Sequence, residues 1–209
     1  MATRPAWTIK DGVVIKENFD FVWNGGFSVT QKQKNINALH QAIRNKKVEN
    51  SIDISSKSTV QIGKDMSAFS LKLSGRFLEN IFQAAKKYEH GGPYLDLLDV
   101  SPKEAKRDER HTNSGVLVAF VRNEEIWSLE PKTAFYDYIY VCAVVEKYGY
   151  DLDISDYQWF TDIEFNPQKS INCQARAAAI YQLIQNEKCY DMIKEKDTWI
   201  SFHKKHVMG

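Results

Sequence analysis

Three long segments of the chain carry apolar residues at helical spacing, and this periodicity constrains the fold more than any other feature. The segments span residues 29–45, 132–148 and 170–186. In the first, Ile36, Leu39 and Ile43 recur three and four positions apart, so they share one face of a helix. Ser28 and Gln31 form a capping-box pattern at its start. The sequence therefore predicts a mainly helical chain.

Shorter segments alternate between apolar and polar residues, as β-strands do. These segments span residues 7–21, 48–58, 65–73 and 115–127. We expect further helices from Glu79 to the glycines before Pro93, from Ser101, and over residues 191–206, with an ordered loop over 157–167. Because the chain has no repeats, low-complexity runs or linker, we expect an α+β fold: a single mainly helical domain over residues 1–209.

The balance of charges limits the classes of function. Twenty-eight Lys and Arg residues against 27 Asp and Glu residues give a net charge of +1, so any contact with nucleic acid is expected to be local. No segment approaches the ~18 apolar residues of a membrane span, and the N-terminal residues lack the apolar core of a signal peptide. The three cysteines show no CxxC spacing, and the five histidines show no clear metal-ligand spacing. We expect a cytoplasmic protein without a disulfide framework, a metal or a cofactor.

The segment from Glu79 to Lys86 places four chemically useful side chains on one face of the expected helix. Glu79, Phe82, Gln83 and Lys86 are spaced three, four and seven positions apart. They would supply an acid–base group, a ring for stacking and a polar anchor in one cleft. The alternative is a partly buried helix with a solvated Glu–Lys face.

A second polar cluster, Ser55-Ser56-Lys57-Ser58, follows an expected strand. Hydroxyls, backbone amides and the ammonium of Lys57 can hold a phosphate, and Lys57 and Ser58 are our candidates for that contact. The same composition is also typical of an ordinary turn.

Four separated pieces resemble, in order, the motifs of the NADAR family, whose name refers to NAD and ADP-ribose metabolism. They are Gly63-Lys64-Asp65-Met66-Ser67-Ala68-Phe69, Glu79-x-x-Phe82-Gln83-Ala84-x-Lys86, Ser101-Pro102-x-x-Ala105-x-Arg107, and Trp159-Phe160-Thr161-Asp162 with Asn172. The resemblance covers roughly residues 55–185, which we take as the core of the domain. Three departures separate this chain from the branch that acts in riboflavin synthesis: Ala68 stands for the usual Asn, Asn80 for His, and the Trp159 segment lacks the family's glycines.

The long segment from Tyr157 to Gln174 looks like the branch associated with DarT-type guanine ADP-ribosyltransferase toxins. That resemblance implies an N-glycosidase that removes ADP-ribose from guanine bases in DNA or RNA and acts as an antitoxin to a DarT-type toxin. Its partners would be ADP-ribosylated guanine, ADP-ribose and, functionally, the toxin. Two rivals remain: an N-glycosidase of ribosylamino-pyrimidine phosphates, and a non-catalytic module that binds ADP-ribose or nucleic acid.

The implied reaction needs two carboxyl groups, one to protonate the leaving nitrogen and one to activate water. We assign these roles to Glu79 and Asp162. Lys86 would keep Glu79 ionised or trap the open-chain sugar as a Schiff base, although Lys57 or Lys32 could equally supply an amine. The alternative for Asp162 is a turn or helix cap.

The remaining candidates would bind substrate. They are Lys57, Ser58, Phe69, Phe82, Gln83, Arg107, Trp159 and Asn172. Among them, Trp159 would stack on a purine and Arg107 would pair with a phosphate. The alternatives are a core aromatic for Trp159 and a solvated helix cation for Arg107.

Overall fold

The computed structural model describes residues 1–208 and has an α+β fold. Its main sheet has the strand order β2-β1-β9-β3. The strands are β1 (Ala2–Lys10), β2 (Val13–Phe21), β3 (Ser51–Asp53) and β9 (Trp159–Thr161). β1 and β2 form an antiparallel hairpin, β9 adds antiparallel to β1, and β3 pairs parallel to β9. The sheet therefore joins the N-terminal hairpin to the segment that carries Asp162.

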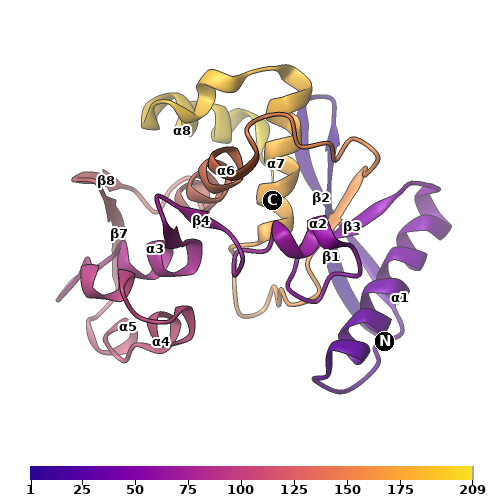
Figure 1. Cartoon of the computed structure of the whole chain (residues 1–209), viewed down its shortest axis with the longest axis horizontal. Coiled ribbons are helices and arrows are strands. Elements are labelled where there is room, and N and C mark those ends of the chain that lie inside the picture. The colour runs from indigo at the N-terminus through magenta and orange to yellow at the C-terminus, as the bar shows by residue number, and fades with distance from the viewer. Residues whose placement is uncertain (209) are drawn as a thin grey trace.

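Helix α1 (Val29–Lys47) covers one face of this sheet (Figure 1). The Ser28 side chain accepts a hydrogen bond from the backbone N–H of Gln31, which confirms the predicted N-cap. Ile36, Leu39 and Ile43 are buried against residues such as Phe19 of β2. The helix ends at Val48, which adopts a left-handed conformation with φ of 56°. We call α1 with the main sheet the α1 side.

Three helices cover the other face and the middle of the molecule. They are α6 (Ala134–Tyr148), α7 (Gln174–Glu187) and, after the short 3₁₀ helix Tyr190–Ile193, α8 (Lys196–His206). The largest buried cluster includes Trp7 and Val14 of the hairpin and Trp199 and Phe202 of α8. The buried core thus extends beyond residues 55–185 at both ends.

The α3 side lies across α6 and α7 from the α1 side, at the left of Figure 1. Its helices are α3 (Leu78–Ala84), α4 (Pro102–Arg107) and α5 (Arg110–Asn113), with a 3₁₀ helix at Leu95–Leu98. Its strands are β4 (Lys72–Leu73), β5 (Arg76–Phe77), β6 (Lys86–Tyr88), β7 (Leu117–Arg122) and β8 (Glu125–Trp127). The predicted hairpin over 115–127 is confirmed by β7 and β8, and the predicted cap of α4 by the reciprocal bonds of Ser101 and Glu104.

The expected helix from Glu79 to the glycines is wrong in its second half. Helix α3 ends at Ala84, and Lys86 begins strand β6, which pairs with Phe120 of β7. All seven residues of α3 are buried, so its surroundings rather than an amphipathic pattern hold it helical. The pairing with β7 then overrides the local helical spacing.

Three other expectations also needed correction. The segment 65–73 is mostly not strand, because the short helix α2 (Gln61–Asp65) precedes it and only Lys72–Leu73 pairs. The strand over 48–58 shortens to β3, and the loop over 157–167 begins with β9. Both β3 and β9 are only three residues long and depend on long-range pairing, β3 with β9 and β9 with both β3 and β1. Among residues 1–208, no helix has the length and apolar character needed to span a bilayer.

Candidate functional site

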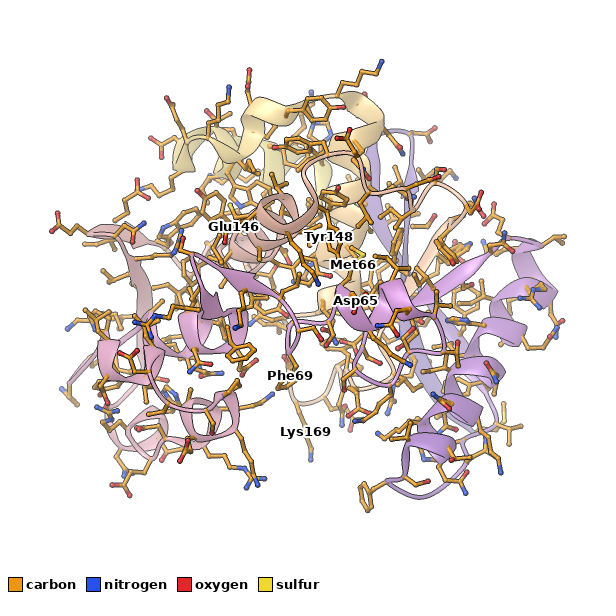
Figure 2. All side chains as sticks on the ribbon, in the orientation of Figure 1. Asp65, Met66, Phe69, Glu146, Tyr148 and Lys169 are labelled. Carbon is orange, nitrogen blue, oxygen red and sulfur yellow. The ribbon has the colours of Figure 1, made fainter. Side chains whose placement is uncertain are left out.

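A cavity of about 1020 Å³ lies where the α3 side meets α6 and the segment between β9 and α7; we call it the first cavity. One part of its lining, the α3 wall, comprises Glu79, Phe82, Gln83, Lys86 and Lys106. The opposite part, the β9 wall, comprises Asp162 and residues 164–172 with Gln174. Figure 2 shows Phe69, a further lining residue, and Lys169 of the β9 wall at the lower middle of the view between the α3 and α1 sides.

On the α3 wall, the amide of Gln83 connects the carboxylate of Glu79 to the amine of Lys86. Gln83 Nε2 donates to Glu79 Oε1 at 2.8 Å, and Lys86 Nζ donates to Gln83 Oε1 at 2.6 Å. Lys106 Nζ lies 3.8 Å from Glu79 Oε1. Although Lys86 lies on a strand rather than on α3, its side chain still meets Gln83, so the predicted cluster of Glu79, Gln83 and Lys86 is assembled in one cavity.

The amine of Lys86 is held in surroundings that disfavour its charge. Burial, supported by the nearby charge of Lys106, lowers the pKa of Lys86 to about 8, although Glu79 acts in the opposite direction. The ammonium also lies 5.2 Å from the ring centroid of Phe82. Near neutral pH, a fraction of Lys86 is therefore a free amine.

On the β9 wall, Asp162 is a buried carboxyl group. Burial raises the pKa of Asp162 to about 8, and the charge of Asp53 adds to this rise. Its Oδ1 accepts hydrogen bonds from the backbone N–H groups of Glu164 and Phe165 at 3.0 and 3.2 Å, which fix the turn after β9. Asp162 is thus both a turn cap and a carboxylic acid that keeps its proton at neutral pH.

Asp53, a residue absent from the sequence-based candidates, lies behind Asp162 and is itself buried. Burial raises the pKa of Asp53 to about 7. Its carboxyl accepts bonds from Ser55 Oγ at 2.5 Å and from the Ile163 backbone N–H at 2.9 Å. A Cβ at Gly63 would overlap the Asp53 carbonyl, so this glycine allows the loop to pack tightly there.

Tyr136 of α6 connects the two walls and was also missed from the sequence. Burial and then the charges of Glu79 and Asp162 raise the pKa of its phenol. Its ring meets the ring of Phe82 edge-on at 5.3 Å, within a cluster that includes Phe120. The only sequence signal was that Tyr136 lies outside the apolar stripe of its helix.

Phe69 and Asn172, two of the predicted binding residues, line the first cavity. Phe69 is 46% exposed, and Lys106 Nζ lies 5.6 Å from its ring centroid. An exposed ring beside a cation suits stacking of a base next to a phosphate. Phe82, by contrast, is almost fully buried in its aromatic cluster and offers only an edge to the cavity.

Four predicted binding residues lie outside the first cavity. Trp159 is 2% exposed, meets Phe19 edge-on and donates from Nε1 to Glu49, so it packs the core and cannot stack on a ligand. Ser58 is fully buried and accepts a bond from the backbone of Val60.

Lys57 and Arg107 are likewise not brought to the cavity lining. Lys57 lies in the loop that supports Asp53, and its backbone N–H is bonded to Ser55 Oγ. Arg107 is an exposed residue in the last turn of α4. Lys32 pairs with Glu164 at 2.9 Å. Of the three lysines considered for chemistry, Lys86 is the one that lines the cavity.

Two side chains that sequence analysis did not select complete the polar lining of the α3 side. Lys106 stands one position before the motif residue Arg107, and His111 follows four positions later. His111 Nε2 lies 2.9 Å from the Ala105 carbonyl, and Nδ1 lies 3.0 Å from Tyr88 Oη, an arrangement that fixes a neutral imidazole. Across residues 1–208, no group of three His, Cys, Asp or Glu residues is arranged to hold a metal ion.

Comparison with known proteins gives the family of the chain. A search of curated proteins found no match to this sequence. The family described as DarT1-associated NADAR antitoxin matches residues 2–208, nearly the whole chain. The chain therefore belongs to the DarT1-associated NADAR antitoxins.

Proposed function

We propose that this protein is an ADP-ribosyl glycohydrolase that removes ADP-ribose from guanine bases in DNA or RNA, and that it thereby counteracts a DarT1-type toxin in the cytoplasm. Family membership supports the antitoxin role. The observation that carries the enzymatic part is the pairing of two buried carboxyl groups in one cavity: Asp162, whose pKa is raised to about 8, and Glu79, which accepts a hydrogen bond from Gln83 and lies near the Lys106 ammonium. A binding module for a diphosphate ligand has no need of two carboxyl groups there.

Asp162 is the general acid. The bond to be broken joins an exocyclic nitrogen of guanine to the anomeric carbon of the ribose, and the nitrogen must leave with the bonding electron pair. With its pKa raised to about 8, Asp162 still carries a proton near pH 7 and can transfer it to that nitrogen. The ring oxygen of the ribose then stabilises the positive charge at the anomeric carbon.

Glu79 is the general base. It accepts a hydrogen bond from Gln83 and lies 3.8 Å from the Lys106 ammonium, and both neighbours suit a carboxylate. Glu79 takes a proton from the water that attacks the anomeric carbon, and Asp162 gives its own proton to the departing guanine nitrogen. The products are free ADP-ribose and intact guanine, and one water is consumed. Asp162 is left ionised and Glu79 protonated, so a proton passes from Glu79 through solvent back to Asp162 before the next turnover.

Lys86 acts on the sugar once it opens. When the ribose ring opens before cleavage, the anomeric carbon forms an imine with the guanine nitrogen; the partly neutral amine of Lys86 displaces that nitrogen, to which Asp162 gives its proton, and hydrolysis of the new imine by one water returns the amine. The Gln83 amide lies between Lys86 and Glu79, so the structure offers little support for a direct ion pair as the main role of Lys86.

The rest of the first cavity suits ADP-ribose. A volume of about 1020 Å³ is within the range of ligand pockets, at its large end. Phe69 would stack on the adenine or on the modified guanine, and Lys106 beside it would meet a phosphate. Gln83 and Asn172 would hold ribose hydroxyls, with Phe82 and Tyr136 behind the sugar.

The test uses an oligonucleotide that carries ADP-ribose on guanine, incubated with the protein and analysed by gel and mass spectrometry. We expect release of ADP-ribose with intact guanine, and no release from an oligonucleotide that carries ADP-ribose on thymine. Glu79→Gln and Asp162→Asn should each abolish turnover, whereas Asp151→Asn, at an exposed carboxylate, should not. Absence of turnover by the wild-type protein, or full activity of both cavity variants, would overturn the proposal.

A further inference from the structure

A second cavity of about 900 Å³ lies beside the first. Its floor is the surface of the β1–β2 hairpin that faces α7 and α8, where Trp7 and Lys16 stand opposite each other across the two strands. One wall is the end of α8 with His203 and Lys204. The other wall is the segment 165–171, most of which also lines the first cavity. The two cavities are therefore neighbours that share one wall.

Among the charged residues that line the second cavity, cations predominate: Arg4, Lys16, Lys132, Arg176 and Lys204. Lys16, Lys132 and Lys204 are exposed at it, and among residues 1–208 none of the three pairs with a carboxylate. Glu130 is the one carboxylate of the described lining. A concave surface with unpaired lysines attracts anions.

Arg176 and His203, which also line the second cavity, both contact the buried carboxylate of Asp137. Arg176 Nε and His203 Nε2 lie 3.0 and 2.9 Å from Asp137 Oδ2. Burial alone would raise the pKa of Asp137, but the charge of Arg176 and the bond to His203 outweigh burial and lower it. The single negative charge in this layer is thus neutralised before it can repel an anion.

Three buried polar atoms of the lining residues have no hydrogen-bond partner in the described chain. They are Nε of Arg4, Nε1 of Trp7 and Nδ1 of His203, and the residues Trp7 and His203 are 2% and 3% exposed. Buried polar atoms are nearly always bonded in folded proteins, so the gathering of three unpartnered atoms in the lining of one cavity indicates a polar ligand that is supplied from outside the chain. Oxygen atoms of a phosphate would serve.

We infer that the second cavity binds phosphates of the nucleic-acid strand next to the modified guanine, while the first cavity holds the ADP-ribose. This inference rests on the proposed function and assigns its substrate class: a polynucleotide rather than a free nucleoside. Lys16, Lys132 and Lys204 contact the strand, and the shared segment 165–171 separates strand from sugar.

The distribution of charge favours a strand over the diphosphate of ADP-ribose. The three lysines come from β2, from the loop before α6 and from α8, so they surround the cavity instead of converging on one point. A strand presents successive phosphates that such spaced cations can follow. The first cavity has Lys86 and Lys106 for the diphosphate, and Lys132 lines both cavities, at the junction between strand and ADP-ribose.

The test compares two double variants with the same change in charge. Lys16→Glu with Lys204→Glu alters only the second cavity, whereas Lys10→Glu with Lys205→Glu alters exposed lysines of the same hairpin and of the same helix, α8, outside both cavities. Binding of an unmodified single-stranded DNA oligonucleotide is measured by fluorescence anisotropy at several salt concentrations. We expect the first variant to weaken binding on the order of tenfold and to reduce the slope of log K against log salt by ~1.4, that is ~0.7 for each lost phosphate contact. The second variant should bind nearly as the wild type does.

Turnover distinguishes this inference from the proposed function. With Lys16→Glu and Lys204→Glu, KM for the ADP-ribosylated oligonucleotide should rise by a similar factor with kcat unchanged. Turnover of ADP-ribosylated guanosine and affinity for free ADP-ribose should stay at wild-type values. If both double variants lost affinity for the oligonucleotide equally, the strand site would be overturned. The same holds if the variant with Lys16→Glu and Lys204→Glu lost affinity for free ADP-ribose. If the wild-type protein has no turnover, the proposed function fails, but the anisotropy measurement still decides whether the second cavity binds a strand.

Discussion

The two walls of the first cavity carry the same functional group in opposite surroundings. On the α3 wall, Glu79 is bonded to Gln83 and lies near the Lys106 ammonium. On the β9 wall, Asp162 is buried beside a second carboxyl group, Asp53, and its pKa rises to about 8. One wall stabilises a carboxylate and the other a carboxylic acid. The difference teaches that the protonation state, and so the catalytic role, follows from the neighbours of a carboxyl group rather than from its type.

The largest effects should come from replacing either carboxyl group by its amide. Because each supplies a proton-transfer step, we expect Glu79→Gln and Asp162→Asn to reduce kcat/KM on the order of a thousandfold. Their stabilities should differ. The pKa of Asp162 is about 8 in the folded chain against an ordinary 3.8, so its folded form keeps a proton that the unfolded chain loses, and stability falls as pH rises between these values.

At pH 7, Asp162→Asn removes this penalty and should raise Tm by a few degrees, at about 2–4 °C for each kcal/mol gained. Glu79→Gln should leave Tm nearly unchanged, because the new amide oxygen still accepts from Gln83. Differential scanning calorimetry at pH 5 and pH 7 measures both variants. A lower Tm of Asp162→Asn at pH 7 would show that the two walls do not differ as described.

The next effect concerns the amine of the α3 wall. We expect Lys86→Ala to lower kcat on the order of a hundredfold, and Lys86→Arg to lower it equally, because a guanidinium keeps the charge but cannot form an imine. Borohydride added during turnover should attach the sugar to the wild-type protein and not to either variant, as mass spectrometry of the intact chain would show. Recovery of activity in Lys86→Arg would instead assign Lys86 a purely electrostatic role.

The sequence predicted the two walls unequally. The caps and apolar stripes of α1 and α4 are local signals, and the predicted Ser28 and Ser101 caps are present in the structure. That Glu79 and Asp162 share a cavity came from the family resemblance, since 83 positions separate them and no periodicity connects them. Lys86 was placed on a helix because its pairing with Phe120 is a long-range contact.

Residues that support the site were the hardest to predict. Tyr136 belongs to a helix that was predicted correctly, but which of its faces meets the cavity depends on where α3 and β9 lie. Asp53 supports Asp162 from a three-residue strand that exists only through its pairing with β9. Trp159 was expected on a ligand because its motif ends at Asp162, yet alternation along β9 turns its side chain toward α1 and into the core.

The pH profile should show the protonation state of the β9 wall. Because Asp162 acts as an acid, kcat/KM should fall as pH rises through about 8, by about tenfold per pH unit once the group is ionised. The remaining activity of Asp162→Asn should not show this fall of kcat/KM at alkaline pH. Deprotonation of Lys86, whose pKa is also about 8, would raise its share of free amine and act in the opposite direction. An increase in kcat/KM above pH 8 would therefore show that Lys86, and not Asp162, controls the rate.

The smallest effect should come from Asp53, which acts on the β9 wall without lining the cavity. Its charge raises the pKa of Asp162 further than burial alone does, so Asp53→Asn should lower that pKa by less than about one unit. The alkaline limb of kcat/KM would move to lower pH by the same amount, and activity at pH 8 would fall a few-fold while activity at pH 6 stayed the same. Ser55→Ala removes a hydrogen bond that lowers the pKa of Asp53, so less Asp53 is ionised at pH 8 and the alkaline limb should move in the same direction by a smaller amount. If Asp53→Asn left the alkaline limb where it lies in the wild-type protein, the charge of Asp53 would not act on Asp162, and the contrast between the two walls would rest on burial alone.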